Sequence, residues 1–414
     1  MTGKDPKEKK SARKTGPGES PAAARKSKAP AAPAKKSEVP AAPAKKAPKK
    51  APKKAAEAGS SSRAALFSWG GVPGEELERL PLAAALDRYR DEYLLANDTM
   101  LRDHTHVKIG GRALHFATAT TVEILQNILM NAADDADMPL CVMGGGSKIL
   151  FDDSGFAGLV LRLGGGAFSS VMPLEEDGVP LVAVGAHALL GRLVKYAEER
   201  NHAGFSDFVG IPATVGGAIA MNAGAMGSSI SERVEEVTVM DLEGKVLTFG
   251  KPELRFGYRS FSLANPPRSG FPGSLGKERK KRVHFPPDGI VIGAKLNLGA
   301  KATRREIEKI REKNLKFRRD NQPKLPSLGS TFKNPPGGKS AGELLDLCGL
   351  KGLRFGGAEI SPVHANFIVN LGNAGSSDVL GLIWSAKKEV MKKFGIDLEP
   401  EIVAFNKWGE RHVF

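Results

Sequence analysis

Two glycine-rich segments place the strongest limits on how this chain folds. The first, Gly144-Gly145-Gly146-Ser147, follows the short apolar run 139–143, and the second spans residues 210–225. Glycine lets the backbone approach a ligand closely and aim successive N–H groups at phosphate oxygens. Either segment alone is equally compatible with a tight structural turn, and no Gly-Lys-Ser/Thr follows to make a Walker loop. Together the two segments favour a dinucleotide ligand.

The 414-residue chain has a formal net charge of +15, most of it near the N-terminus. Residues 1–63 contain 18 Lys and Arg against 5 Asp and Glu, which leaves 43 against 41 in the remainder. This segment repeats Ala, Pro and Lys with little apolar surface to bury, so we predict a disordered, extended tail. It is either a solvated spacer or a weak, salt-sensitive binder of polyanions. The nearly neutral remainder need not bind nucleic acid.

The two cysteines, Cys141 and Cys348, lie far apart in apolar surroundings. They form neither a disulfide framework nor a metal-ligand spacing, so we expect structural thiols, no metal and a reducing compartment. The sequence has no run of 18 apolar residues and no apolar core of a secretory signal at its N-terminus. We therefore expect a cytoplasmic protein without a membrane span, and a monomer.

Capping signals and apolar periodicity predict the regular elements. Thr120-x-x-Glu123 and Thr303-x-x-Glu306 are capping boxes that open helices. The patterns predict further helices over 189–199 and 377–394, strands over 139–143, 159–163, 181–184 and 366–371, and a hairpin over 234–249. The basic, Pro- and Gly-rich stretch 264–287 predicts an exposed insertion loop. We expect domains over 74–299, which include this loop, and 300–408.

Three motifs carry side chains suited to chemistry. In Phe256-Gly257-Tyr258-Arg259-Ser260, the flanking aromatic residues can present Arg259 to a carboxylate or phosphate. Residues 326–335 gather hydroxyl, amide and basic groups, with Ser330 as a possible proton donor. Glu401 alternates with apolar neighbours, which allows it to point into a site. Taken singly, a surface arginine and a turn serine are the simpler interpretations.

In their order along the chain, these motifs resemble the UDP-N-acetylenolpyruvoylglucosamine reductase family. The resemblance covers roughly 300 residues, and the tail and the 264–287 loop lie outside it. It is carried by residues 104–111, Gly144-Gly145-Gly146-Ser147, residues 211–227, Gly257-Tyr258-Arg259, residues 329–335, residues 364–370 and Glu401.

The resemblance implies an α+β fold with a two-subdomain FAD-binding region of the vanillyl-alcohol-oxidase (PCMH) type and a C-terminal α/β substrate domain. It implies that NADPH reduces FAD, and that the reduced flavin passes a hydride to C3 of the enolpyruvyl group of UDP-N-acetylenolpyruvoylglucosamine. Because residues 298–300 lead straight into the helix at Thr303, the chain resembles the shorter type of this family, which lacks an extra tyrosine-bearing segment.

The resemblance also implies roles for individual residues. Arg259 would bind the enolpyruvyl carboxylate, Glu401 would help to polarise it, and Ser330 would protonate C2. Tyr258, Lys333 and Asn334 would contact the substrate. The cofactor-binding residues would be Gly144, Gly145, Gly146, Ser147, Lys148, Ile211, Pro212, Thr214, Val215, Gly216, Gly217, Ala218, Asn222 and Gly224.

The chain departs from the family pattern at three positions. Lys148 stands where the family usually has Asn, which adds a charge near the expected pyrophosphate. Met226 replaces a tyrosine and Val403 replaces an arginine, so a hydroxyl and a positive charge near the site are lost. We expect these changes to alter substrate affinity more than reaction type, because Arg259, Ser330 and Glu401 all remain.

Three other functions are considered. Another FAD oxidoreductase of this fold, such as an alcohol or hydroxy-acid oxidase, would need no acid at Ser330. A polyanion-binding protein would depend on the tail but would leave the ordered motifs unexplained. A hydrolase using Ser330 and His364 lacks the Gly-x-Ser-x-Gly turn that exposes such a nucleophile.

Overall fold

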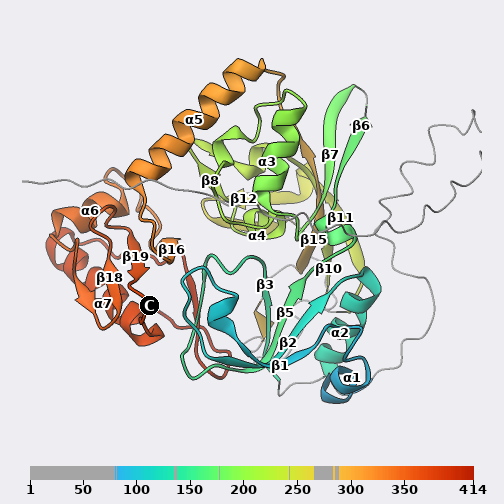
Figure 1. Cartoon of the computed structure of the whole chain (residues 1–414), viewed down its shortest axis with the longest axis horizontal. Helices are drawn as coiled ribbons and strands as arrows, with labels where there is room; N and C mark the ends of the chain where they lie inside the picture. The colour runs from blue at the N-terminus through green and yellow to red at the C-terminus, as the bar shows by residue number, and fades with distance from the viewer. Residues whose placement is uncertain are drawn as a thin grey trace, which may run out of the picture. The chain divides into compact units, whose positions relative to one another are not determined.

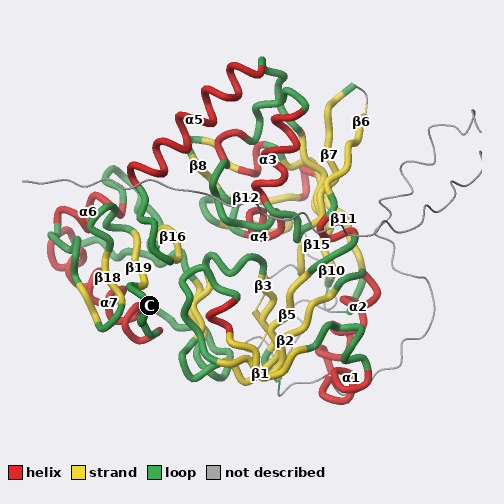
Figure 2. Tube along the Cα trace, in the orientation of Figure 1, coloured by secondary structure: helices red, strands yellow, loops and turns green. Residues whose placement is uncertain are grey.

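The computed structural model describes Leu80 and residues 82–134, 138–176, 178–241, 243–264, 283–284 and 289–414 (Figure 1). The predicted tail over 1–63 and most of the predicted loop over 264–287 lie outside these residues. The described part combines helices and strands (Figure 2), which confirms the mixed α and β content expected from the sequence. Its strands form two five-stranded sheets, one four-stranded sheet and three two-stranded pairs.

The first sheet has the strand order β1-β2-β5-β3-β14, and its β2, β5, β3 and β14 pairs are parallel. Six of the eight residues of β5 are buried, as expected for a parallel strand covered on both faces. The predicted strands at 139–143 and 159–163 are confirmed. The bounds are β1 (Ala96–Met100), β2 (Arg112–Ala119), β3 (Leu140–Met143), β5 (Phe156–Leu163) and β14 (Val283–His284).

Two sequence predictions in this region need correction. The helix predicted after Thr120 is α2 (Val122–Asp134), but the hydroxyl that accepts from the Ile124 N–H belongs to Thr121, so the predicted cap was one residue early. The predicted 264–287 loop contains β14, whose two residues pair with Leu140 and Cys141 of β3. Such a short strand has no periodicity of its own, and its pairing is set by the open edge of β3.

The second sheet is antiparallel, with the order β11-β10-β15-β7-β6. The predicted 234–249 hairpin is confirmed as β10 and β11, and the predicted 181–184 strand lies in β7. Asp241 closes the hairpin, because its Oδ1 accepts the N–H groups of Glu243 and Lys245 at 3.0 and 2.8 Å. The bounds are β6 (Val171–Glu176), β7 (Val179–Gly185), β10 (Val234–Met240), β11 (Val246–Gly250) and β15 (Ile290–Asn297).

Short elements around this sheet carry several site residues. The helix predicted at 189–199 is confirmed as α3 (Leu190–Glu199), and α4 (Val215–Ala220) begins inside the second glycine-rich segment. The hairpin of β12 (Leu254–Gly257) and β13 (Ser260–Leu263) turns at Tyr258 and Arg259. The remaining elements here are α1 (Leu82–Arg88), β8 (Gly224–Ala225) and β9 (Ser228–Ser229).

The predicted capping box at Thr303 is confirmed, and it opens α5 (Arg304–Asn321). Ile307 and Asn314 are buried on the predicted face, whereas Phe317 is 49% exposed. A four-stranded antiparallel sheet follows, and its predicted strand at 366–371 is confirmed as β19. Its order is β16 (Ser327–Ser330), β19 (Phe367–Asn370), β18 (Ala358–Ile360) and β17 (Arg354–Phe355), packed with α6 (Ala341–Leu347) and α7 (Ser376–Phe394).

The chain then returns to the first glycine-rich segment. The strand β20 (Val403–Phe405) pairs in parallel with β4 (Ile149–Phe151), which follows Lys148 directly. Phe405 packs with Phe151 and Phe156 in one apolar cluster, while Ile402 and Ala404 belong to the core around α7. This pairing therefore brings Glu401 beside the glycine loop. No helix in the described residues has the length and apolarity needed to cross a membrane.

Candidate active site

The two glycine-rich segments lie far apart in the sequence but contact each other in the fold. A Cβ placed on Gly144 would lie 2.5 Å from Thr214 Oγ1, and the Ser147 hydroxyl donates to the Pro212 carbonyl. Around Gly145, by contrast, a Cβ would meet no atom closer than 3.9 Å. The backbone at Gly145 is thus open to close approach, which fits a large planar or phosphate-bearing cofactor at this surface.

The second segment divides into buried and accessible residues. Val215, Gly216 and Ala218 are buried, and a Cβ on Gly216 would lie 2.7 Å from the Cβ of Ala186, so these residues pack α4 against β7 and β15. Thr214 caps α4 by accepting from the Gly217 N–H at 3.3 Å. Ile211, Pro212 and Gly217 remain partly accessible. We infer that the three accessible residues, and not the buried ones, are available to a cofactor.

Asn222 and Gly224 are engaged by the neighbouring β12–β13 hairpin. Asn222 Nδ2 donates to the Gly257 carbonyl at 2.8 Å, and the Arg259 guanidinium donates to the carbonyls of Asn222 and Gly224 at 3.4 and 3.5 Å. Both residues therefore join the second glycine-rich segment to Arg259, and their contact with a cofactor stays a prediction.

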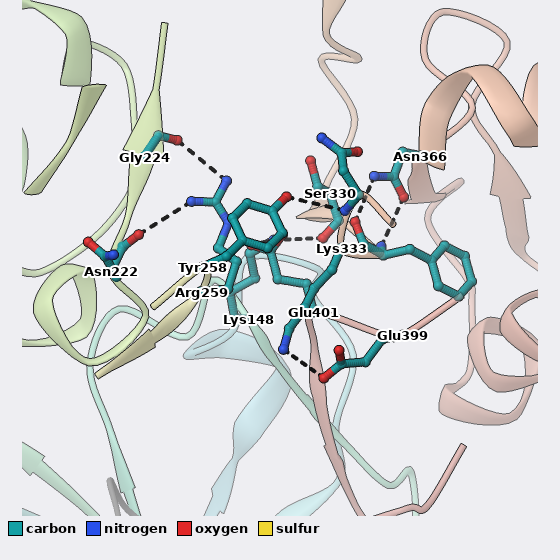
Figure 3. Close-up of polar contacts among 12 residues, drawn as sticks. Lys148, Asn222, Gly224, Tyr258, Arg259, Ser330, Lys333, Asn366, Glu399 and Glu401 are labelled. Carbon is teal, nitrogen blue, oxygen red and sulfur yellow. Dashed lines mark hydrogen bonds and ion pairs between the residues drawn. The ribbon is translucent and has the colours of Figure 1, made fainter. Parts of the chain in front are cut away.

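The three residues predicted to be catalytic are brought together from distant parts of the chain (Figure 3). Arg259 Nε lies 3.2 Å from Glu401 Oε1, and both side chains are largely buried, with 19% and 6% exposure. Arg259 has φ +55°, the left-handed region that non-glycine residues seldom adopt, at the tip of its hairpin. Such a conformation persists where surrounding contacts over-determine it, which is common at functional sites.

Lys148 completes this group, although its side chain was predicted to contact cofactor phosphates. Its Nζ lies 3.1 Å from the same Glu401 Oε1 and donates to the Ser330 carbonyl at 2.6 Å. Burial lowers the pKa of the Lys148 ammonium, and the neighbouring Glu401 carboxylate opposes that shift. Two basic side chains, Lys148 and Arg259, therefore share one carboxylate oxygen beside Ser330.

The backbone ties Ser330 to Glu401. The loop after β16 pairs with the segment before β20, because the Glu401 N–H donates to the Thr331 carbonyl and the Lys333 N–H donates to the Glu399 carbonyl, both at 2.8 Å. Within the described part of the chain, no group hydrogen-bonds the Ser330 hydroxyl, so it is available to a ligand.

The predicted substrate residues lie at this same loop. The Asn334 N–H donates to the Tyr258 hydroxyl at 3.2 Å, and Tyr258 is 54% exposed. Lys333 Nζ forms a 2.6 Å ion pair with the exposed Glu399, so it is held at the rim by a partner that water can screen (Figure 3). The structure therefore gathers Tyr258, Lys333 and Asn334 around Arg259 and Ser330.

Asn366 supports the site but was given no role from the sequence. Its amide brackets Phe332, accepting from the Phe332 N–H and donating to the Phe332 carbonyl, each at 2.9 Å. In the sequence, the only indication of this role was a polar amide placed directly before an apolar strand. The neighbouring His364 accepts from the Asn366 N–H through Nδ1 at 3.2 Å, and among the described residues nothing joins it to Ser330. A Ser–His hydrolase therefore has no support from the geometry.

Comparison with known proteins agrees with this arrangement. Residues 113–250 match a family model described as an FAD binding domain, and residues 321–405 match one described as UDP-N-acetylenolpyruvoylglucosamine reductase, C-terminal domain. The crystal structure of the UDP-N-acetylenolpyruvylglucosamine reductase of Thermus caldophilus is similar with a TM-score of 0.58 and 36% identity, covering 74% of this chain and 97% of that one.

Curated sequences give the same result. The UDP-N-acetylenolpyruvoylglucosamine reductase of Pelobacter propionicus is 37% identical over 310 residues, which is 75% of this chain and 94% of that protein. The reductase of the same name from Synechocystis sp. is also 37% identical, over 75% of this chain and 90% of that protein. These similarities confirm the fold class and the resemblance inferred from the motifs: the chain belongs to the UDP-N-acetylenolpyruvoylglucosamine reductase family.

Proposed function

We propose that this chain is an FAD- and NADPH-dependent reductase that converts UDP-N-acetylenolpyruvoylglucosamine into UDP-N-acetylmuramate for peptidoglycan precursor synthesis. The observation that carries the proposal is the convergence of Arg259, Glu401 and Ser330 beside two facing glycine-rich segments. Residues around Gly145 and Gly217 would hold FAD, which supplies the electron pair to the substrate after reduction by NADPH. The rest of the chemistry falls to the side chains of the chain itself.

Arg259 would bind and polarise the enolpyruvyl carboxylate. Its Nε is paired with Glu401, while its two terminal nitrogens make only long contacts of 3.4 and 3.5 Å to backbone carbonyls. Those nitrogens can therefore turn to a planar carboxylate in the bidentate geometry that suits a guanidinium. Hydride addition at C3 leaves negative charge on C2 and the carboxylate, and a fixed cation at that place stabilises it.

Ser330 would then donate its proton to C2. A serine hydroxyl is a weak acid in water, so the step depends on its position against a strongly basic carbon. The backbone that follows Ser330 is held twice, by Lys148 at the Ser330 carbonyl and by the pairing of Thr331 with Glu401. Glu401, in turn, pairs with Arg259 through its side chain and with Thr331 through its backbone, so it sets the position of Arg259 relative to Ser330.

Anaerobic half-reactions test these roles. In Ser330→Ala, NADPH should reduce the flavin at the normal rate, whereas reoxidation by the sugar nucleotide should slow by about 100- to 10,000-fold, the usual contribution of a general acid. Ser377→Ala, at an exposed serine in the first turn of α7, is the control and should reoxidise normally. Normal reoxidation of Ser330→Ala would remove Ser330 from the mechanism.

The same assay addresses Arg259 and the alternative oxidase. Arg259→Lys keeps the charge but loses the fork, so we expect a lower kcat/KM for the sugar nucleotide with unchanged flavin reduction. An undiminished kcat/KM would argue against carboxylate binding by Arg259. Failure of the reduced wild-type protein to be reoxidised by this substrate, together with reaction of an alcohol or hydroxy acid, would favour an oxidase of the same fold.

We further propose how the parts of the chain contribute. Residues 74–299 would form the FAD-binding domain and residues 300–408 the substrate domain, because the glycine-rich segments lie in the first range and Ser330 and Glu401 in the second. A cytoplasmic location fits two nucleotide substrates and the free thiols of Cys141 and Cys348. Sedimentation tests the expected monomer, and a polyanion affinity that falls with salt and vanishes without residues 1–63 tests the tail.

A further inference from the structure

Lys148 contacts both halves of the candidate active site with a single ammonium group. Its Nζ lies 2.6 Å from the Ser330 carbonyl oxygen and 3.1 Å from Glu401 Oε1 (Figure 3). Its own carbonyl accepts the Val403 N–H at 2.9 Å, so the backbone of Lys148 is fixed by the β4–β20 pairing. The lysine is thus anchored at one end by its strand and at the other by two residues of the site.

The contact with Ser330 restrains a part of the chain that has freedom of its own. Gly329, which precedes Ser330, has φ +69°, and a Cβ placed there would lie 3.4 Å from Lys148 Nζ. A glycine at this position leaves the direction of the next peptide weakly determined. The peptide that follows Ser330 is held at both of its polar groups: the Thr331 N–H donates to the Asn366 carbonyl at 2.7 Å, and the Ser330 carbonyl accepts from Lys148. Lys148 therefore acts together with Asn366 to set the direction in which the serine side chain projects.

The contact with Glu401 changes the charge of the site. Arg259 and Glu401 alone would form a neutral pair, but Lys148 adds a second cation on the same Oε1. While Lys148 is protonated, the three side chains together carry one surplus positive charge next to the Ser330 loop. In a largely buried setting such a charge attracts an anionic ligand more strongly than it would in water. A substrate carboxylate supplies the missing negative charge.

We infer that Lys148 is a positioning residue for the reduction: it orients Ser330 through the Ser330 carbonyl and, by sharing Glu401, leaves Arg259 free to bind the substrate carboxylate. This inference rests on the roles proposed for Ser330 and Arg259. It differs from the expectation drawn from the sequence, in which the Lys148 charge serves the cofactor phosphates.

The test uses the FAD-loaded full chain and the variant Lys148→Met, which keeps the length of the side chain but removes its charge and donors. Flavin content and reduction by NADPH should match the wild type. Reoxidation by UDP-N-acetylenolpyruvoylglucosamine should slow by about 10- to 100-fold, the loss expected for a hydrogen bond to a charged donor. Lys148→Arg should restore most of the rate, because it keeps the charge and can reach both partners.

Lys295→Met is the matched control. Lys295 is also a partly buried lysine with a carboxylate partner, at 2.7 Å from Glu236 Oε1, but the pair joins β15 to β10 outside the site residues. Both half-reactions of this variant should proceed at the wild-type rate. A slow reoxidation confined to Lys148→Met would therefore reflect the site and not the loss of a buried ion pair.

Three results would overturn the inference, each in a distinguishable way. Rapid reoxidation of Lys148→Met beside a slow Ser330→Ala would overturn the role of Lys148 alone and leave the proposed mechanism intact. Loss of flavin or slow reduction by NADPH in Lys148→Met, or equal impairment in Lys148→Arg, would assign Lys148 to cofactor binding or packing. Rapid reoxidation of Ser330→Ala would remove the proposed acid, and the inference would fail with it.

Discussion

Replacing Asn366 by alanine should destabilise the protein and disturb the Ser330 loop together. The Asn366 amide is buried, with 4% exposure, and makes two 2.9 Å hydrogen bonds to the N–H and carbonyl of Phe332. Phe332 is itself 2% exposed, so water cannot replace the lost partner without opening the loop. Thr331 and Lys333 on either side pair with Glu401 and Glu399, which fixes the direction in which Phe332 presents its own polar groups.

The size of the effect follows from these two bonds. Leaving a buried donor or acceptor without a partner costs about 1–3 kcal/mol for each group, so Asn366→Ala should lower the free energy of unfolding by about 2–6 kcal/mol. Asn366→Asp keeps an acceptor for the Phe332 N–H but sets a second carboxylate oxygen against the Phe332 carbonyl. It should also be destabilising at pH 7, and its stability relative to the wild type should recover as acid protonates the new carboxyl group.

Urea unfolding of the FAD-loaded protein, followed by circular dichroism, measures the stability, and the anaerobic half-reactions measure the function. Flavin reduction by NADPH should be retained and reoxidation by the sugar nucleotide should slow. Asn321→Ala is the control, because Asn321 makes one exposed bond, to the Phe317 carbonyl at 2.9 Å, and should change stability by less than about 0.5 kcal/mol. A loss below about 0.5 kcal/mol in Asn366→Ala would refute the reasoning.

Two further predictions concern buried titratable groups. Burial raises the pKa of Asp241 above its ordinary 3.8, so ionisation of this carboxyl group as the pH rises destabilises the folded state. The free energy of unfolding of Asp241→Asn, measured in urea relative to wild type, should therefore increase between pH 4 and pH 7. A difference that does not change with pH would contradict this. Burial also raises the pKa of the Cys141 thiol to about 12, whereas Cys348 is only partly buried. A thiol reagent at pH 8 should therefore label only Cys348 in the native protein and both cysteines in denaturant. Prompt labelling of the native Cys348→Ser variant would contradict this.

The elements with strong local signals could be predicted from the sequence. The capping box at Thr303, the helix that ends at Phe394 and the hairpin around Asp241 depend on nearby residues, and each appears in the structure. The cap of α2 was misplaced by one residue because Thr120 and Thr121 offer the same hydroxyl chemistry. The strand β14 was missed because its pairing depends on β3, more than a hundred residues away.

The identity of the candidate site residues could be predicted, but their contacts could not. Arg259, Ser330 and Glu401 stand out by motif and resemblance, and their roles stay proposals. Nothing local to Lys148 indicates that its Nζ lies beside Ser330 and Glu401, since both partners are distant in sequence. Asn366 was overlooked for the same reason, because its role depends on the polar groups of Phe332, which lies in the loop after β16, more than thirty residues earlier in the chain.

The pairing of β20 with β4 has a consequence for how the protein is made. It sets Val403 opposite Ile149, so the two partners are separated by most of the folded chain. Closing so long a loop is slow compared with forming a hairpin, because the intervening chain loses conformational entropy before the contact stabilises the structure. During synthesis the glycine loop has left the ribosome long before Glu401 exists, so the carboxylate that Arg259 and Lys148 share is added after both cations. Between the addition of Arg259 and that of Glu401, the nascent chain carries both cations without the carboxylate that they later share.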